Sequence, residues 1–165
     1  MMLNEDEVRG LLPMDECVDV LDALFKESAE GSVSNMNRHR VPLPKGSMQV
    51  MAGMSSANGA TGLKTYVTGT GGGAKMVVLL YDITTAEPIA FIAANALGAI
   101  RTGAASGVAT RHMARANAKS VAIIGSGSQA GTQLAAVCAA RPIEQAFVFS
   151  RTADRREAFA NKMSA

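Results

Sequence analysis

The chain has 165 residues, a net charge of +2 and only 4% aromatic residues, with no basic block interleaved with aromatics. This composition disfavours nucleic-acid binding, because proteins that bind nucleic acids gather Lys and Arg on one face or along one helix. The acidic N-terminal residues do not fit a signal peptide, no apolar run approaches the length of a membrane span, and the cysteines lack metal-ligand spacing. We therefore expect a cytoplasmic protein with no metal site, no nucleic-acid partner and no membrane partner, and with Cys17 and Cys138 both buried.

The first part of the chain predicts two helices followed by a series of strands. Asn4 can cap a short helix whose first turn is acidic, and Pro13 opens a longer helix that ends at Gly31. Asp82–Glu87 is expected to be a hairpin turn, and Thr68–Gly73 a glycine-rich loop. Alternating or apolar runs bounded by Gly, Pro and Asn predict strands at Arg38–Val41, Ser47–Met54, Gly62–Val67, Lys75–Tyr81 and Pro88–Ala93.

A helix rich in alanine and glycine is predicted next, at Ala96–Arg115. Glycine inside a helix costs roughly 1 kcal/mol relative to alanine. Gly98, Gly103 and Gly107 therefore predict close packing, or the close approach of a ligand. The helix is followed by a short linker at Asn117–Lys119.

After the linker comes the order strand, glycine turn, helix, strand, which is typical of a dinucleotide-binding domain. Ser120–Ile124 is a short apolar run suited to a buried parallel strand, and it leads into the G-x-G-x-x-A pattern of Gly125–Ala130. A helical pattern and a second strand at Gln145–Ser150 complete the unit. Only one further helical pattern follows, at Ala153–Met163, so we expect an incomplete domain and a truncated chain.

The small residues of the glycine turn have separate predicted roles. Gly125 permits the tight turn, Gly127 lets the backbone approach a pyrophosphate closely, and Ala130 is small enough for the helix to pack near the strand. The helix N-terminus offers free N–H groups and the positive end of its dipole to the anion. Gln129 is either a solvated first-turn residue or a cofactor contact, and the sequence leaves both open.

The end of the second strand predicts which cofactor binds. Enzymes that use NAD usually place Asp or Glu there to hold the ribose hydroxyls, whereas this chain has Ser150, Arg151 and Thr152. An arginine can pair with a 2′-phosphate, and the two hydroxyls can donate hydrogen bonds to it. We expect NADP(H) to be preferred, with NAD(H) as the alternative. The competing interpretation is that Arg151 is a solvated loop residue.

Three cations lie in otherwise apolar surroundings before this domain. Arg40 and Lys64 interrupt strand patterns, and Arg101 lies inside the Ala/Gly helix. Lys and Arg are rarely buried without an anionic partner. The three side chains either converge on one carboxylate or are separate solvated groups and ordinary ion pairs.

Five segments occur in an order that is specific when they are taken together. The first four are Arg38–Arg40, Met48–Met51, Gly62–Tyr66 and Leu97–Ser106, and the last of these leads into a fifth, Val121–Ala130. The Arg-Thr-x-Ala-x-Ser helix directly before a dinucleotide strand is the most diagnostic of them. In these segments the chain resembles the ornithine cyclodeaminase/mu-crystallin family, from about Val33 to its last residue.

The resemblance implies a homodimer that acts on a small amino or imino acid with a nicotinamide cofactor. Three residues match the positions that bind the substrate carboxylate: Arg40, Lys64 and Arg101. Three others match positions at the cofactor: Thr102, Ser128 and Gln129. The implied fold is α/β. Residues 1–117 form an α+β substrate-binding and dimerisation segment, and residues 118–165 the first β-α-β of an incomplete Rossmann-like domain.

One departure from the family pattern bears on the reaction. Cyclodeaminases have a glutamate in the second strand, where this chain has Gln49, and glutamine cannot serve as a carboxylate base. The family's catalytic aspartate lies beyond the last residue, so the catalytic residues are unknown. We expect an NAD(P)-dependent oxidoreductase of amino or imino acids, such as a ketimine reductase or a dehydrogenase. The alternatives are an ornithine cyclodeaminase, a non-catalytic NADPH-binding protein similar to mu-crystallin, and an inactive fragment.

Overall fold

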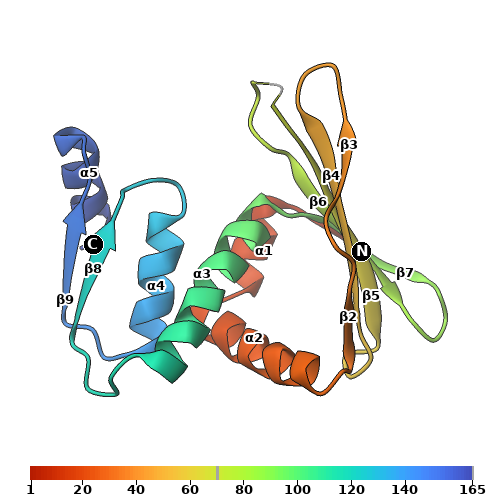
Figure 1. Ribbon diagram of the computed structural model, residues 1–165, viewed down its shortest axis with the longest axis horizontal. Helices are drawn as coiled ribbons and strands as arrows, with labels where there is room; N and C mark the ends of the chain where they lie inside the picture. Colours follow the sequence, from red (N-terminus) through yellow and green to blue (C-terminus); the bar gives the residue numbers. More distant parts are fainter. Residues whose placement is uncertain (70, 165) are drawn as a thin grey trace. The chain divides into compact units, whose positions relative to one another are not determined.

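The computed structural model describes residues 1–69 and 71–164, which divide into two compact units (Figure 1). The first comprises Met1–Leu12 and Ala23–Gly98, and the second Pro13–Asp22 and Ala99–Ala165. Thr70, in the predicted loop, and Ala165, in the predicted second domain, lie outside the described residues. The predicted division into a substrate-binding segment (residues 1–117) and a dinucleotide-binding segment (residues 118–165) concerns function, and it stays a prediction.

A mainly antiparallel sheet forms the first unit. Its spatial order is β1-β7-β6-β5-β4-β2, with β3 also paired to β4, and among the described strands of this sheet only β1 and β7 pair in parallel. The predicted strands are confirmed with small shifts at their ends, but the two short strands β1 and β2 were not predicted. The strands are β1 (Met2–Leu3), β2 (Val33–Asn35), β3 (His39–Pro42), β4 (Ser47–Ser55), β5 (Ala60–Thr68), β6 (Met76–Asp82) and β7 (Pro88–Ala93).

The predicted turn between β6 and β7 is confirmed. The backbone N–H of Asp82 donates to the carbonyl of Glu87, and the Asp82 carboxylate accepts from the N–H groups of Thr84 and Thr85. The backbone hydrogen bonds from Thr85 and Thr84 lower the pKa of Asp82, because they stabilise its charged form.

The two faces of this sheet differ in chemistry. Paired residues of antiparallel strands point to the same side, and the register places Arg40, Gln49 and Tyr66 in one row, with Lys64 beside Tyr66. We call this side the site face. The opposite side, which we call the apolar face, carries Val50, Leu63, Val67, Leu79 and Phe91.

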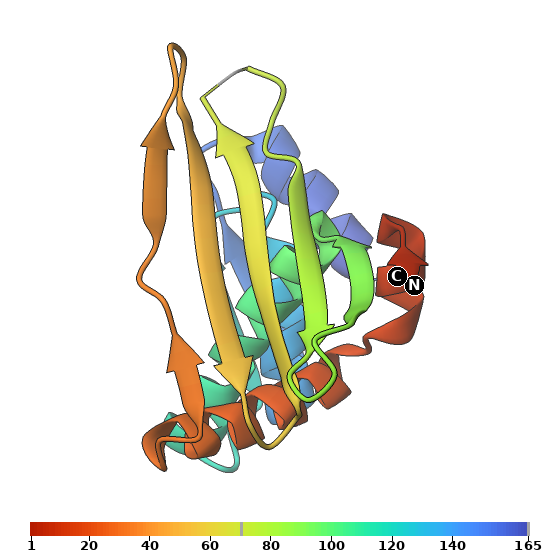
Figure 2. The same ribbon diagram turned by 90° about the vertical axis from the view of Figure 1, so that its right-hand side faces the viewer.

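Helical segments of the first unit lie on the site face. The hydroxyl of Ser55 donates to the carboxylate of Glu27, and a Cβ added at Gly98 would lie 3.1 Å from the sulfur of Met76. Figure 2 looks onto the sheet from the other side, and no described helix of this unit crosses in front of it.

Side-chain caps hold the helix ends of the first unit. The predicted cap at Asn4 is confirmed, because its side-chain oxygen accepts from the N–H groups of Asp6 and Glu7 at the start of α1 (Glu5–Leu11). The carboxylate of Glu5 accepts from the N–H groups of Asn95 and Ala96, at 2.9 and 2.6 Å. A negative charge thus lies at the N-terminus of α3 (Asn95–Met113), where the helix dipole favours it.

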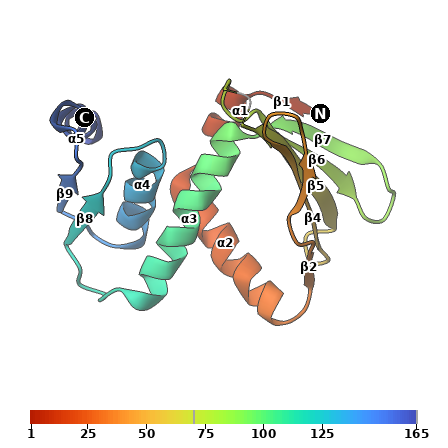
Figure 3. The same ribbon diagram turned by 45° about the horizontal axis from the view of Figure 1, so that its top comes forward.

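The second unit has a two-stranded parallel sheet and helices. The strands are β8 (Ser120–Ile124) and β9 (Gln145–Phe149), and the helices are α4 (Ala130–Ala140), α5 (Ala153–Met163) and parts of α2 (Met14–Ala29) and α3. Figures 1 and 3 show α4 beside the part of α3 that belongs to this unit. A Cβ added at Gly103 would lie 2.4 Å from the carbonyl oxygen of Thr132, so glycine is what lets these helices approach.

Polar contacts fasten the C-terminal end of α3. The guanidinium of Arg141 donates to the carbonyl oxygens of Arg111, Ala114 and Arg115, at 2.6, 2.9 and 3.0 Å. A cation at the negative end of a helix is favourable, and these bonds also satisfy carbonyls that lack helical partners. On the same helix, the Arg111 guanidinium pairs with Asp19 at 2.7 Å, and the hydrogen bond raises the pKa of Arg111.

Candidate functional site

The glycine turn after β8 has the backbone that the motif requires. Gly125 has a φ of 105°, a conformation that side chains rarely adopt, and its N–H donates to the carbonyl of Phe149 at 2.7 Å. That bond joins the turn to the end of β9. A Cβ added at Gly127 would meet no atom within 4 Å, so the space above this backbone is open.

Helix α4 begins directly after the turn, and no side chain caps its N-terminus. Ala130 is buried, as its predicted packing role requires, while Ser128 and Gln129 are exposed at the helix start. The cap residue Gln129 makes no side-chain cap hydrogen bond, and the first turn of α4 has no acidic residue. The N–H of Ala130 donates to the carbonyl of Gly127 at 3.0 Å, and the positive end of the helix dipole is available to an anion such as a pyrophosphate.

Thr102 lies on α3 and is joined by a hydrogen bond to α4. The side-chain amide of Gln133 on α4 donates to the carbonyl oxygen of Thr102 at 3.3 Å. The predicted contact of Thr102 with a cofactor stays a prediction. The hydrogen bond to Gln133 has no signal in the sequence, because it depends on how α3 and α4 pack.

The end of β9 carries the three residues expected to select the cofactor. Ser150 is half-buried, whereas Arg151 and Thr152 are exposed. Thr152 is the cap residue of α5 and makes no side-chain cap hydrogen bond. The guanidinium of Arg156 donates to the carbonyl of Ser150 at 2.9 Å and so holds this turn. Nothing in the sequence indicated that Arg156 would hold this turn.

Two of the three predicted carboxylate ligands lie on the site face of the first unit. The Nε of Arg40 on β3 donates to the side-chain oxygen of Gln49 on β4 at 3.2 Å. The Nζ of Lys64 on β5 lies 5.9 Å from the centroid of the Tyr66 ring, within the range of a cation–π contact. The sequence identified both cations, but their contacts with Gln49 and Tyr66 were not predicted.

The third predicted ligand, Arg101, is exposed on the part of α3 that belongs to the second unit. Its convergence with Arg40 and Lys64 on one carboxylate therefore stays a prediction.

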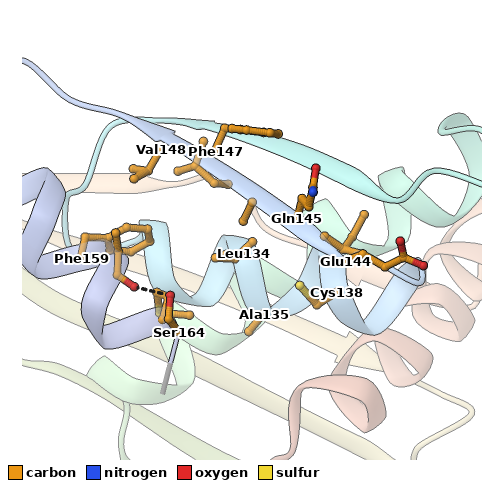
Figure 4. A pocket seen from close by; sticks show the side chains of 14 residues that line it. Leu134, Ala135, Cys138, Glu144, Gln145, Phe147, Val148, Phe159 and Ser164 are labelled. Carbon is orange, nitrogen blue, oxygen red and sulfur yellow. Dashed lines mark hydrogen bonds between the residues drawn. The ribbon is translucent and has the colours of Figure 1, made fainter.

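A cavity of about 470 Å³ in the second unit lies apart from these residues. Figure 4 shows it between the strands and the helices, with Leu134 and Cys138 from α4 and Phe159 from α5 in its lining. None of the residues of the glycine turn or of the β9 end lines it. We therefore do not assign the cofactor to this cavity.

The cysteines are partly as expected. Cys17 is buried, but the prediction for Cys138 was wrong, because this residue is exposed on α4. Its apolar helical spacing predicted burial, yet the surrounding helix surface is incompletely covered. Desolvation raises the pKa of both thiols, which disfavours the nucleophilic thiolate at neutral pH.

Residues 1–69 and 71–164 contain neither a metal-binding cluster nor a membrane-spanning helix. No group of three or more His, Cys, Asp and Glu side chains could hold a metal ion there. In the same residues, no helix combines the length and the apolar character that crossing a membrane requires.

Comparison with known proteins matches residues 1–165 to the model of the ornithine cyclodeaminase/mu-crystallin family. The chain belongs to this family. Its α/β architecture is that of the family's NAD-binding fold, of which it covers about half. The resemblance seen in the glycine turn, the Arg-Thr helix and the two strand cations is thus confirmed over the whole chain.

Three relatives illustrate the family. A Δ1-pyrroline-2-carboxylate reductase of Bacillus cereus is 37% identical over an alignment of 169 positions, which covers 96% of this chain and 51% of that protein. The structure of the Thermococcus litoralis Δ1-pyrroline-2-carboxylate reductase with NADH and L-proline has a TM-score of 0.91 and 31% identity, covering 99% of this chain and 53% of that one. An archaeal alanine dehydrogenase dimer with bound NAD has a TM-score of 0.91 and 26% identity, with coverages of 99% and 52%. The chain thus spans about half the length of the relatives it matches.

Proposed function

We propose that the protein is an NAD(P)-dependent oxidoreductase of imino or amino acids, with a cyclic imino acid as its substrate. The observation that carries the proposal is the placement of Arg40 and Lys64 on one sheet face, in a chain that also has an open glycine turn before a helix N-terminus that no side chain caps. The 37% identity to a Δ1-pyrroline-2-carboxylate reductase and the likeness to a solved one with L-proline support this substrate class.

The residues of this chain would bind and orient the reactants. Arg40, Lys64 and Arg101 would hold the substrate carboxylate by charge-assisted hydrogen bonds, which fixes the position of the adjacent imino carbon. The Gly125–Ala130 turn, with Ser128 and Gln129, would hold the pyrophosphate of a nicotinamide cofactor, and Thr102 would contact that cofactor. When bound, the nicotinamide supplies the hydride. The carboxylate contacts would hold the imino carbon within reach of that hydride.

The reaction is tested by adding Δ1-pyrroline-2-carboxylate and reduced cofactor to the full-length protein and following the loss of reduced cofactor. We expect L-proline as the product, and no turnover of Δ1-pyrroline, which lacks the carboxylate. Saturable binding of the reduced cofactor with no oxidation of it by any cyclic imino acid would instead favour the non-catalytic alternative.

We propose that the protein prefers NADP(H), the cofactor with a 2′-phosphate, over NAD(H). Its support is the turn after β9, where Ser150, Arg151 and Thr152 stand in place of a carboxylate and Arg156 braces the backbone. We expect Arg151→Ala to weaken NADPH binding by about tenfold and to leave NADH binding nearly unchanged, because only NADPH offers the phosphate partner. Fluorescence titration of both cofactors measures this.

The matched control for this prediction is Lys162→Ala. This substitution removes one exposed cation near the C-terminal end of α5, the helix that follows Arg151, and so lies away from the end of β9. A loss of NADPH affinity equal in both variants would show a general charge effect, and an equal loss for both cofactors in Arg151→Ala would contradict a phosphate contact.

Cyclodeamination is the second candidate reaction within this family. It would release ammonia from a diamino acid without a net change in the absorbance of the cofactor. Gln49 opposes it, because a buried amide in the β4 position cannot act as the carboxylate base. An ammonia assay with L-ornithine separates the two reactions.

We also propose a homodimer that uses the apolar face of the first unit. Neighbouring strands present a continuous apolar surface there, and Phe91 is 42% exposed. A second copy would bury this surface, and the related archaeal alanine dehydrogenase structure is a dimer. Light scattering of the full-length protein is expected to give twice the monomer mass. Two other expectations also stay predictions. They are the roles of residues 1–117 and 118–165 as separate domains, and the cytoplasmic location.

A further inference from the structure

Gln49 is a buried polar residue in contact with one of the proposed carboxylate ligands. It is only 4% exposed, and it lies opposite Arg40 in the β3–β4 register. Its side-chain oxygen accepts from the Nε of Arg40 at 3.2 Å, and its side-chain NH₂ donates to the Oγ of Ser47 at 2.7 Å. Both ends of the amide are therefore engaged.

The chemistry of the two neighbours fixes which way the amide points. A guanidinium has only donors, so the group that faces Arg40 must be the carbonyl oxygen of the amide. The NH₂ end then points to Ser47, whose hydroxyl oxygen accepts from it. This short chain of hydrogen bonds holds the Arg40 guanidinium by its inner nitrogen, Nε, and leaves the outer Nη1 and Nη2 edge uncommitted to Gln49.

The neutrality of Gln49 matters as much as its geometry. Among the described residues, no carboxylate forms an ion pair with Arg40, so the Arg40–Gln49 pair keeps a full positive charge. A glutamate in the same place would match the guanidinium fork with two oxygens and would cancel that charge. The outer edge would then be a weaker partner for any other carboxylate.

We infer that Gln49 is a positioning and specificity-determining residue. It anchors Arg40 through Nε and, because it is neutral, reserves the outer edge and the charge of Arg40 for the carboxylate of the substrate. The inference rests on the proposed function, since it assigns a task to Gln49 within the same carboxylate site.

Steady-state kinetics of the full-length protein with Δ1-pyrroline-2-carboxylate tests the inference. We expect Gln49→Glu to raise KM by about tenfold, with kcat changed by less than about threefold, because carboxylate binding is weakened and no proton-transfer group is lost. Gln49→Met, which keeps the size but not the acceptor, should raise KM less. Ser47→Ala should have a smaller effect in the same direction.

The control for added negative charge is Asn37→Asp, at an exposed position of the same unit, which should leave KM unchanged. An unchanged KM in Gln49→Glu, or a fall in kcat alone, would overturn the inference. Should Gln49→Glu fail to fold, the KM of Ser47→Ala and Gln49→Met still decides the question.

A second measurement needs no substrate. Phenylglyoxal modifies accessible guanidinium groups, and peptide mass spectrometry reports the rate at Arg40. We expect the rate to fall several-fold in Gln49→Glu, because the new carboxylate occupies the guanidinium, and an equal rate would overturn the inference. If the wild-type protein neither binds L-proline nor reduces the imino acid, the proposed function fails, and the modification rates still show whether residue 49 controls Arg40.

Discussion

Replacing Gly103 with alanine is expected to lower the free energy of unfolding by about 2 kcal/mol. An added Cβ would lie 2.4 Å from the carbonyl oxygen of Thr132 and 2.7 Å from its carbonyl carbon. These are backbone atoms of α4, which cannot rotate away, so the helices must separate and lose packing. In an open helix position the same substitution would stabilise by up to roughly 1 kcal/mol, since alanine favours helix.

The matched control for this prediction is Gly131→Ala on α4. A Cβ there would lie 3.7 Å from the sulfur of the flexible Met163 side chain, an ordinary contact. Chemical denaturation followed by circular dichroism should therefore give a lowered midpoint for Gly103→Ala and an unchanged or raised one for Gly131→Ala. Equal midpoints would contradict the close α3–α4 packing.

Replacing Arg40 or Lys64 with methionine is expected to lower kcat/KM for the imino acid by about 100-fold, mainly through KM. Each substitution removes a cation that would hold the substrate carboxylate, while methionine keeps much of the apolar stem. The two effects should be less than additive if both cations bind the same carboxylate. Kinetics of the single and double variants of the full-length protein measures this.

Lys45→Met provides the charge control for these variants. Lys45 is an exposed residue between β3 and β4 of the same unit, and its loss should leave kcat/KM within about twofold of the wild type, as expected for a surface residue. A similar loss in all three variants would point to a general electrostatic effect. Retention of kcat/KM in Arg40→Met would remove Arg40 from the proposed site.

The glycines of α3 were correctly singled out from the sequence, but the sequence could not decide between two explanations for them. Their cost in helix propensity predicted either close packing or a nearby ligand. The structure shows close packing at all three: Gly98 faces the Met76 sulfur, Gly103 the α4 backbone, and Gly107 the side chain of Val18 and residue Ala136. The helix pattern could not separate the two meanings, because both require the absence of a Cβ.

Local signals determined much of this protein by themselves. The cap at Asn4, the glycine turn at Gly125–Ala130 and the Asp82–Glu87 turn depend on neighbouring residues, and all three were predicted. The strand positions followed from alternation, and the family followed from motifs whose order is preserved along the chain. Such features are encoded within a few residues, so the sequence alone suffices for them.

Contacts between distant residues were decided only by the tertiary structure. β1 pairs in parallel with β7 although the two are far apart in the sequence, and two residues leave no strand pattern to detect. The bond of Gln49 to Arg40 depends on the β3–β4 register, and the brace from Arg156 to Ser150 on the geometry of one turn. A polar side chain looks the same in the sequence whether it is solvated or bonded, because its partner is chosen by packing.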